Sequence, residues 1–309
     1  MSEQPKLHHP WLVAVWPGMG SVAIAAGYYL MAKLGMHGLA EFSGQELFDA
    51  EHVEVRGGLI RPGRLPRSRL FVWNDPRAQR DIVVFIGEAQ PPVGKHAFCR
   101  RLIEYARELG VERVFTFAAM ATPMQPADHA RTFGAATDES SLLELKRQKI
   151  AILEDGQIGG LNGVLLGVAA ELGMSGSCLL GEMPHTFAQL PFPKASLAVL
   201  ETFAAISSIE VDLHELREQA RVMEAKLGEL LERMQSAARE PAASEEPSYG
   251  AELDEEQGPG GEDRRRIDAL FERAKADRAK AYELKRELDR LGVFREYEDR
   301  FLDLFKKPG

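Results

Sequence analysis

Residues 11–32, WLVAVWPGMGSVAIAAGYYLMA, decide the fold class of this chain. The stretch contains no charged residue, and its length alone would suit a membrane-spanning helix. Pro17 and the glycines after it would break such a helix in its first third, and the apolar run before them is shorter than the roughly seven residues that a signal peptide needs. We therefore predict a short buried strand at 12–16, then a tight turn and a helix over 21–34.

Apolar runs typical of strands alternate with helical patterns as far as about residue 210. The predicted strands lie at 12–16, 69–73, 81–87, 113–119, 132–137, 149–153 and 177–181, and the predicted helices at 21–34, 95–109, 139–148 and 161–172. Short continuous apolar strands separated by helices are typical of an α/β sheet that is covered on both faces. We therefore assign residues 1–210 to one α/β domain built on a parallel or mixed sheet.

Composition and charge exclude several classes of protein. The 309 residues are 45% hydrophobic and 28% charged, which excludes a mainly disordered chain. The formal net charge of −9 disfavours nucleic acid and anionic membrane surfaces as partners. Cys99 and Cys178 lie inside apolar runs, and no Cys/His spacing matches a metal site. We therefore expect a cytoplasmic protein without a metal ion or a cofactor.

The pattern changes at Val211. Apolar residues recur at spacings of three and four over 211–238, which predicts a heptad helix of the coiled-coil or helix-hairpin type. Residues 239–261 hold one basic and seven acidic residues with several Gly and Pro, so we expect an acidic flexible linker there. The three-four pattern returns over 262–309 and predicts C-terminal helices.

The apolar faces of these helices need a partner. About 23 flexible residues reach roughly 25–30 Å, whereas packed helix axes lie about 10 Å apart, so the linker permits two arrangements. The C-terminal helices can pair with residues 211–238 of the same chain as an antiparallel hairpin, or with those of a second chain. Because the linker offers no apolar anchor, we expect the C-terminal helices to be separable from the α/β domain.

A glycine motif follows the first strand. Residues 18–23, GMGSVA, match the GxGxxA pattern in which helix N-terminal N–H groups hold the pyrophosphate of a dinucleotide. However, Pro17 precedes the first glycine, and Glu41, the candidate ribose ligand, follows no clear second strand. A tight turn between a strand and a helix needs glycine for backbone reasons alone, and we favour that interpretation over a nicotinamide or flavin site.

Polar residues follow several of the predicted strands, and ligands of open α/β sheets bind beyond the carboxyl ends of the strands. A candidate ligand pocket at this edge would be lined by Gly18, Gly20, Glu88, Gln90, Asn162, Glu182 and His185. Two carboxylates and an imidazole could hold a proton relay if burial raised the pKa of Glu88 or Glu182. Acids just after strands more often cap the next helix or its loop, and this structural interpretation is the stronger one.

Several motifs in fixed order resemble those of one family. The segments VWPGMGSVA, FIGEAQPP, FTFAAMATP, DGQIGGLNGVLL, CLLGEMPHT and PFPKASLAVLETFAAISSIEVD follow the order seen in the PAC2 family, which is named after a proteasome assembly chaperone. The resemblance covers residues 11 to about 235. The stretch AYELKRELDRLGVFREYEDRFLDLF is similar to the tail of some bacterial members. The chain thus resembles a bacterial-type member of the PAC2 family.

This resemblance implies both a fold and a function. It implies a three-layer α/β/α sandwich of the phosphorylase/hydrolase-like kind with a C-terminal helical extension. It also implies a homo-oligomer that binds protein partners as an assembly-chaperone-like factor and catalyses no reaction. Some proteasome-directed members end in a hydrophobic-Tyr-any tripeptide, whereas this sequence ends in Lys307, Pro308 and Gly309, so we do not expect docking by that route.

The alternative function is that of a small-molecule enzyme with its pocket at the strand ends. The fold resemblance would then imply a nucleoside phosphorylase or hydrolase, and the activity ascribed to some relatives an ATP-dependent ligase. The sequence contains neither a glycine-rich phosphate loop nor a convincing set of magnesium carboxylates for a ligase. A protein-binding role is therefore the favoured interpretation.

Overall fold

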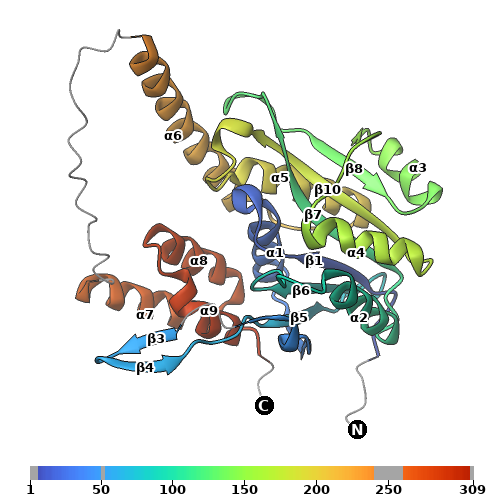
Figure 1. The fold of residues 1–309 in the computed structure, drawn as a ribbon, viewed down its shortest axis with the longest axis horizontal. Helices are drawn as coiled ribbons and strands as arrows, with labels where there is room; N and C mark the ends of the chain where they lie inside the picture. The colour runs from blue at the N-terminus through green and yellow to red at the C-terminus, as the bar shows by residue number, and fades with distance from the viewer. Residues whose placement is uncertain (1–5, 50–52, 240–259, 307–309) are drawn as a thin grey trace.

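The computed structural model describes residues 6–49, 53–239 and 260–306. Its centre is an eight-stranded sheet with the strand order β2-β5-β6-β1-β7-β10-β8-β9 (Figure 1). These strands are β1 (Trp11–Val15), β2 (His37–Glu41), β5 (Ser68–Trp73), β6 (Ile82–Gly87), β7 (Arg113–Thr122), β8 (Thr132–Ala136), β9 (Ala151–Ile152) and β10 (Ser175–Pro184). The predicted α/β class with a mixed sheet is confirmed.

Four adjacent strands form the parallel centre of the sheet. β1 pairs in parallel with β6 and with β7, and β10 pairs in parallel with β7 along its whole length. β5 and β8 run antiparallel to their inner neighbours, β6 and β10. The carboxyl ends of β6, β1, β7 and β10 therefore lie at one edge of the sheet, which is where the sequence predicts the candidate pocket.

Helices cover both faces of the sheet. They are α1 (Val22–Lys33), α2 (Lys95–Glu108), α3 (Glu139–Arg147), α4 (Gly160–Glu171) and α5 (Pro193–Ser207). Val13 of β1 belongs to the core beneath α1 and α5, whereas Leu12 belongs to the core beneath α2 and α4. Because both faces of β1 are buried, the strand is apolar at every position rather than at every second one.

Four further helices follow the sheet domain. They are α6 (His214–Arg239), α7 (Gly261–Ala276), α8 (Ala281–Arg290) and α9 (Phe294–Asp303). Tyr28 of α1 packs edge-on against Phe294 and Phe301, and Phe305 packs against Phe71 of β5. The C-terminal helices thus share a hydrophobic core with α1 and β5, which argues against their expected separability.

The apolar faces predicted for residues 211–238 and 262–309 both contact α1. Leu216 of α6 is fully buried, and the Tyr29 hydroxyl donates a hydrogen bond to the carbonyl of Asp212 just before α6 (2.7 Å). The ring of Tyr282 of α8 packs edge-on against Tyr29, and its hydroxyl donates to the side chain of Gln219. The second half of α6 projects away from the sheet (Figure 1).

The sequence does not predict three of the strands. They are β2 and the two strands of a separate hairpin, β3 (Val53–Arg56) and β4 (Leu59–Pro62). Most of the predicted acidic linker, residues 240–259, lies outside the described residues. Among the described helices, none is both long and apolar enough to cross a membrane.

Candidate functional site

The turn from β1 into α1 contains the two predicted pocket glycines. Gly18 is exposed, whereas Gly20 is buried with a φ of +60°, and a Cβ there would lie 2.6 Å from Sδ of Met183. The Gly20 N–H donates to the carbonyl of Ala188, and the Gly20 carbonyl accepts from the N–H of Phe192 (both 3.0 Å). The backbone groups of Gly20 therefore bind the chain itself, which favours the backbone explanation of this glycine over a dinucleotide site.

Gln90 connects this turn to the start of α4. Its Nε2 donates to the carbonyl of Pro17 (3.2 Å), and its Oε1 accepts from the N–H of Leu161 (3.0 Å). Asn162 follows in α4 and is buried, and its main-chain oxygen accepts from the hydroxyl of Thr116 (3.0 Å). Gln90 thus satisfies a free N–H group in the first turn of α4 and connects this turn to the start of α1.

Glu182 and His185 form a second group at the end of β10. Arg131 donates to both carboxylate oxygens of Glu182, at 2.6 and 2.8 Å, and the hydroxyl of Thr122 donates to the same carboxylate (2.9 Å). The hydrogen bonds from Arg131 lower the pKa of Glu182 to about 2. His185 is exposed, and its Nδ1 donates to the main-chain oxygen of Thr122 (3.0 Å). The raised pKa that a proton relay would need is therefore absent at Glu182.

Glu88 lies just after β6 and faces the C-terminal helices. Its side chain is 6% exposed and lies 3.0 Å from a guanidinium nitrogen of Arg64 and 3.7 Å from one of Arg69. Asp299 of α9 pairs with the same two arginines and with Arg67. Although burial alone would raise the pKa of Asp299, the hydrogen bond from Arg69 lowers it. This arginine–carboxylate cluster connects the end of β6 and the start of β5 to α9.

A partly buried carboxyl group lies beside this cluster. Glu298 of α9 accepts a hydrogen bond from the hydroxyl of Tyr28 (2.7 Å), and burial raises the pKa of Glu298. Sequence reasoning missed Glu298, because it stands in a highly charged helix whose pattern gives no sign of which acid is buried. Its partner Tyr28 lies 270 positions away in the chain.

The seven predicted pocket residues thus fall into three groups. Gly18, Gly20, Gln90 and Asn162 lie around the turns that begin α1 and α4, Glu182 and His185 meet at Thr122, and Glu88 faces α9. No hydrogen bond or ion pair between described residues joins Glu88 to Glu182 or His185. The described ranges contain no group of three or more His, Cys, Asp or Glu that could hold a metal ion.

The two cysteines offer no reactive thiolate. Cys99 lies within α2 and Cys178 within β10, and both are fully buried. Burial raises the pKa of each thiol to about 12. Both residues therefore act as small apolar core side chains, as the sequence predicts.

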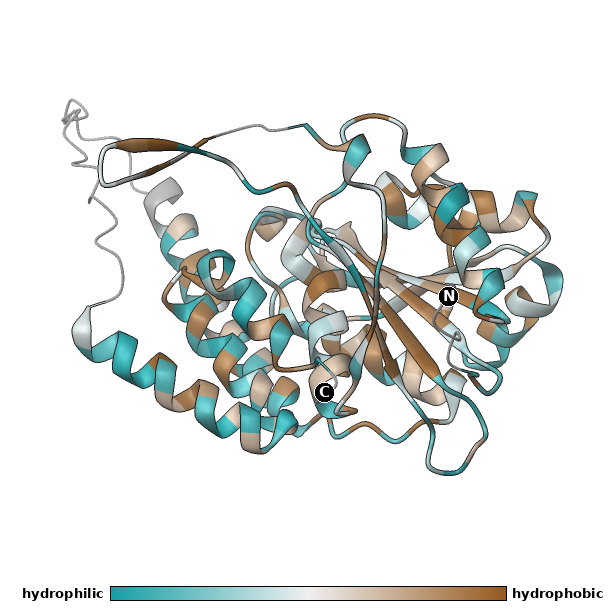
Figure 2. Ribbon diagram, turned by 90° about the horizontal axis from the view of Figure 1, so that it is seen from below, coloured by the Kyte–Doolittle hydropathy of each residue, from teal (hydrophilic) through white to brown (hydrophobic). Residues whose placement is uncertain are grey.

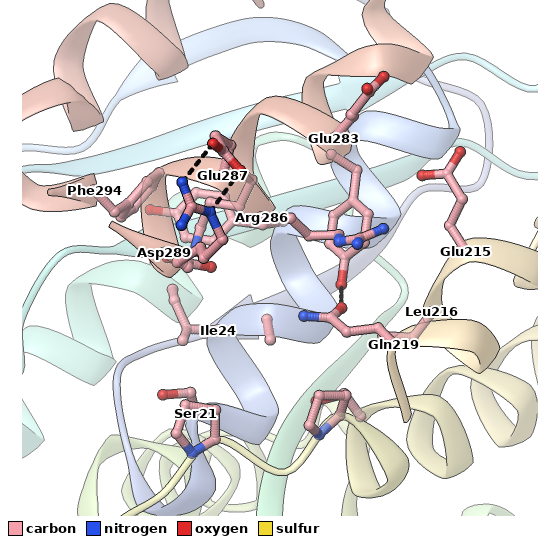
Figure 3. Close-up of a pocket in the computed structure, with 18 of the residues that line it drawn as sticks. Ser21, Ile24, Glu215, Leu216, Gln219, Glu283, Arg286, Glu287, Asp289 and Phe294 are labelled. Carbon is pink, nitrogen blue, oxygen red and sulfur yellow. Dashed lines mark hydrogen bonds and ion pairs between the residues drawn. The ribbon is translucent and has the colours of Figure 1, made fainter. Parts of the chain in front are cut away.

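A cavity of about 1050 Å³ lies between the sheet domain and the C-terminal helices (Figure 3). Its lining includes Ile24 of α1, Gln219 of α6 and Arg286 of α8, and the side chains of Gln219 and Arg286 lie close together in Figure 3. Two of the predicted pocket residues, Gly20 and Glu88, line it, and the other five do not. The cavity is therefore built mainly by helices that the predicted pocket did not include.

The hairpin β3–β4 projects from the body of the molecule (Figures 1 and 2), and we call residues 53–62 the arm. Four of its apolar side chains are exposed, with exposed fractions of 56% for Val53, 66% for Val55, 64% for Leu59 and 74% for Ile60. Val55 lies opposite Ile60, so these two side chains share one face of the hairpin. The arm thus presents apolar side chains that no other part of the described chain covers.

The arm has a recognisable pattern in the sequence. VEVRGGLIRP, residues 53–62, places a Gly-Gly pair between two short apolar-containing runs, which is a signature of a two-residue hairpin turn. Gly57 and Gly58 have φ of +60° and +77°, as such a turn requires. Sequence reasoning missed the hairpin because each run is short and contains charged residues.

The sheet domain is similar to a known family of proteins. The model of the PAC2 family matches residues 12–231, which span the sheet domain and most of α6. An uncharacterised protein of Methanocaldococcus jannaschii is 30% identical over 176 residues, which cover 55% of this chain and 67% of that protein.

Solved structures show the same fold. PbaB, an archaeal proteasome activator of Pyrococcus furiosus, is 25% identical, with a TM-score of 0.63 over 75% of this chain and 96% of that chain. A proteasome-assembly chaperone homologue of Mycobacterium tuberculosis is 21% identical, with a TM-score of 0.61 over 75% of this chain and 97% of that chain. Because the family model matches more than half of its length and solved relatives share its sheet domain, the chain belongs to the PAC2 family.

Proposed function

We propose that this chain is a non-catalytic, protein-binding assembly factor that also associates with copies of itself. Solved structures similar to it include one described as an archaeal proteasome activator and others described as homologues of proteasome-assembly chaperones. The partner that these names suggest is a subunit of a ring-shaped protease. Protein partners, with no nucleic acid and no membrane, are part of the proposal.

The exposed arm is the observation that carries this proposal. A two-stranded hairpin on its own is at best marginally stable in water, and this one leaves Val55 and Ile60 exposed on one face. Exposed apolar groups gathered on one projecting element mark a protein–protein contact. A second copy of this chain that covers this face would bury the apolar side chains and fix the hairpin, and the partner subunit would bind the assembled copies.

The polar residues at the strand ends support a non-catalytic role. Arg131 neutralises Glu182, and Arg64 pairs with Glu88. Gln90 is engaged by two backbone groups. A general acid or base needs a free carboxyl or imidazole near its substrate, whereas both carboxylates pair with arginines and the imidazole of the exposed His185 donates through Nδ1 to the main-chain oxygen of Thr122.

Several finer assignments belong to the same proposal. They are a three-layer α/β/α sandwich of the phosphorylase/hydrolase-like kind with a helical extension, the domain limits 1–210, 211–238, 239–261 and 262–309, a bacterial-type family member, a cytoplasmic location and a homo-oligomer. The helices on both faces of the sheet support the first of these. The exposed arm supports the last.

Sedimentation velocity tests the proposal directly. The full chain is mixed with isolated subunits of an archaeal proteasome, and we expect a boundary faster than that of either protein alone. The double substitution V55E/I60E should abolish this boundary, whereas L143E, at an exposed leucine of α3, should preserve it. The absence of a complex with the unmodified chain would contradict the proposed partner.

A thermal-shift screen tests the enzyme alternative. Nucleotides and nucleosides are added to the full chain, and we expect no shift of the melting temperature. A ligand at a hundred times its dissociation constant would add about 2.7 kcal/mol of stability, which such a screen detects. A clear shift with one nucleotide would favour the enzyme alternative over the assembly factor.

A further inference from the structure

The cavity between α6 and the C-terminal helices has an apolar floor and helical walls (Figure 3). Ile24 and Phe294 contribute apolar surface at its base, and Leu216 and Met223 do so along α6. α7 and α8 form the opposite wall, with Leu270 facing the cavity from α7. Beyond the hydrogen bond from Tyr282 of α8 to Gln219 of α6, which joins the two walls, these helices form a groove of the kind that accepts a third helix.

Several cations on this groove have no partner among the described residues. Lys226 lies on the α6 wall, Arg273 and Arg286 on the opposite wall, and Arg295 at the end formed by α9. All four are exposed, and none of their side chains makes an ion pair or hydrogen bond within the described chain. Other lining cations are neutralised, such as Lys285, which pairs with an aspartate four positions later (2.7 Å). Among the described lining residues, these four cations face one unpaired carboxylate, that of Glu283, so the groove carries an excess of positive charge.

The lining face of α6 continues beyond the cavity. Leu216, Gln219, Met223 and Lys226 line it at spacings of three and four residues, and Leu230 and Met234 continue the same spacing along the projecting half of the helix (Figure 1). Leu230 is 39% exposed and Met234 is 49% exposed. Leu216 is fully buried and Gln219 is bonded to Tyr282, so the open part of this face runs from Met223 to Met234 and is about 17 Å long at 1.5 Å per residue.

We propose that this groove binds an acidic amphipathic helix of a partner protein. Apolar side chains of that helix would cover Met223, Leu230 and Met234, and its flanking carboxylates would pair with the cations on the two walls, Arg273 and Arg286 among them. The proposal rests on the proposed function, since it names the class of segment that the assembly factor recognises.

The shape and charge of the groove favour this occupant over others. Leu230 and Met234 lie on the projecting half of α6, outside the cavity, so a small molecule in the cavity would leave them exposed. A nucleic-acid backbone presents phosphates along its whole length and would leave the exposed apolar side chains of Leu230 and Met234 uncovered. A helix with apolar and acidic side chains fits both the apolar floor and the charged walls.

Fluorescence anisotropy with a designed peptide tests the proposal. The probe is a labelled helical peptide with Leu at positions i, i+3, i+4 and i+7, Glu on both flanks of that stripe and Gln elsewhere. We expect saturable binding to the full chain that weakens by at least about tenfold when salt is raised to roughly 1 M, because salt screens exposed charges. A peptide with Lys in place of each Glu should not bind.

Substitutions in the protein locate the binding. R273E/R286E should weaken the binding of the Glu peptide by at least about tenfold, and L230S/M234S should weaken this binding as well. R147E provides the matched control, because Arg147 of α3 is also exposed and makes no ion pair with any described residue. Equal binding of the Lys peptide, or no effect of R273E/R286E, would overturn the proposal.

The groove and the arm are tested independently of each other. The arm variant V55E/I60E should bind the peptide unchanged, and R273E/R286E should self-associate as the unmodified chain does, so that each proposal can fail without the other. A labelled single-stranded RNA and vesicles with anionic lipids are tested in parallel. Binding of either that depends on Arg273 and Arg286, without binding of the Glu peptide, would overturn the proposed occupant.

Discussion

Glu182 is a buried carboxylate whose charge is balanced by one arginine. It accepts hydrogen bonds from the guanidinium and the N–H of Arg131 and from the hydroxyl of Thr122. We predict that E182Q lowers the free energy of unfolding at pH 7 by about 1–3 kcal/mol, because strong acceptor sites for buried donors are lost. Urea denaturation of the two proteins measures this difference.

The pH dependence of this difference follows from the pKa of Glu182. The pKa of Glu182 is about 2 in the folded chain, below the roughly 4.3 of an unfolded glutamate. The stabilisation by the ionised carboxylate is therefore complete at pH values above roughly 4.3. This stabilisation is lost as the pH falls towards 2. The difference in the free energy of unfolding between the unmodified chain and E182Q should therefore narrow. E171Q, at an exposed ion pair, should show little effect at either pH. A gap that widens in acid would contradict this assignment of the pKa.

Glu298 has the opposite response to pH. Burial raises the pKa of its carboxyl, so ionisation at neutral pH costs folding free energy. We predict that E298Q raises the melting temperature at pH 7, because an amide oxygen can still accept the hydrogen bond from Tyr28 (2.7 Å) without carrying a charge. The advantage should shrink as the pH falls through the raised folded pKa of Glu298 towards the lower unfolded one, since protonation then removes the charge in both states.

The charges around Glu298 also shift the pKa of its carboxyl. Glu88 adds to the rise in its pKa, whereas Arg64 and Arg69 oppose it, and burial is the largest cause. E296Q, on the exposed surface of the same helix, is the matched control and should leave the melting temperature unchanged at both pH values. A lower melting temperature of E298Q at pH 7 would contradict the prediction. It would show that the arginines, rather than burial, determine the pKa of this carboxyl.

At the level of the elements, α7–α9 complete the core beside α1. Phe301 is fully buried and packs against Tyr28, Phe294 and Phe305. We predict that F301A lowers the free energy of unfolding by about 3–5 kcal/mol, because it leaves a large cavity in this core. L143A, at an exposed leucine of α3, should change it by less than about 0.5 kcal/mol.

The same variant tests whether the C-terminal helices unfold with the sheet. Far-ultraviolet circular dichroism reports the helices, and tryptophan fluorescence reports the sheet, because Trp11 and Trp16 are buried in and beside β1. We expect the two signals to change in one shared transition in F301A. A circular dichroism transition that precedes an unchanged fluorescence transition would show that the C-terminal helices unfold as a separate unit.

The elements differ in how clearly the sequence predicts them. β1 and β6 are apolar at almost every position, because both of their faces are buried, and this pattern is visible in the sequence. β2, with the sequence HGLAE, is partly exposed along its length and pairs only with β5 inside the sheet. Its outer edge contacts the C-terminal segment, in which the Phe305 carbonyl accepts a hydrogen bond from the N–H of Gly38. Such tertiary pairing leaves no local signal in a single sequence.

At the level of the whole molecule, the sequence predicts the edge of the sheet but not the grouping of its polar residues. The carboxyl ends of the parallel strands do lie together, as their order requires. Glu88 nevertheless faces α9, because Arg64 and Arg69 hold it beside Asp299, more than two hundred positions away in the chain. Contacts over such a separation depend on the docking of the C-terminal helices, which no local pattern predicts.

In the proposed protein-binding role, the arm is the surface through which copies of the chain meet. Val55 and Ile60 are more than half exposed on one face of an isolated hairpin. Burying such a face removes apolar surface from water, at about 25 cal/mol for each Å². The net charge of −9 keeps the assembled protein soluble without determining its contacts.

Light scattering coupled to gel filtration tests this role of the arm most directly. Over a micromolar concentration series, we predict that the unmodified full chain has the molar mass of two or more copies. V55E/I60E should elute with the mass of one copy and keep its circular dichroism spectrum, and L143E should assemble as the unmodified chain does. A mass of one copy for the unmodified chain at every concentration, or an assembly that V55E/I60E leaves intact, would contradict association through the arm.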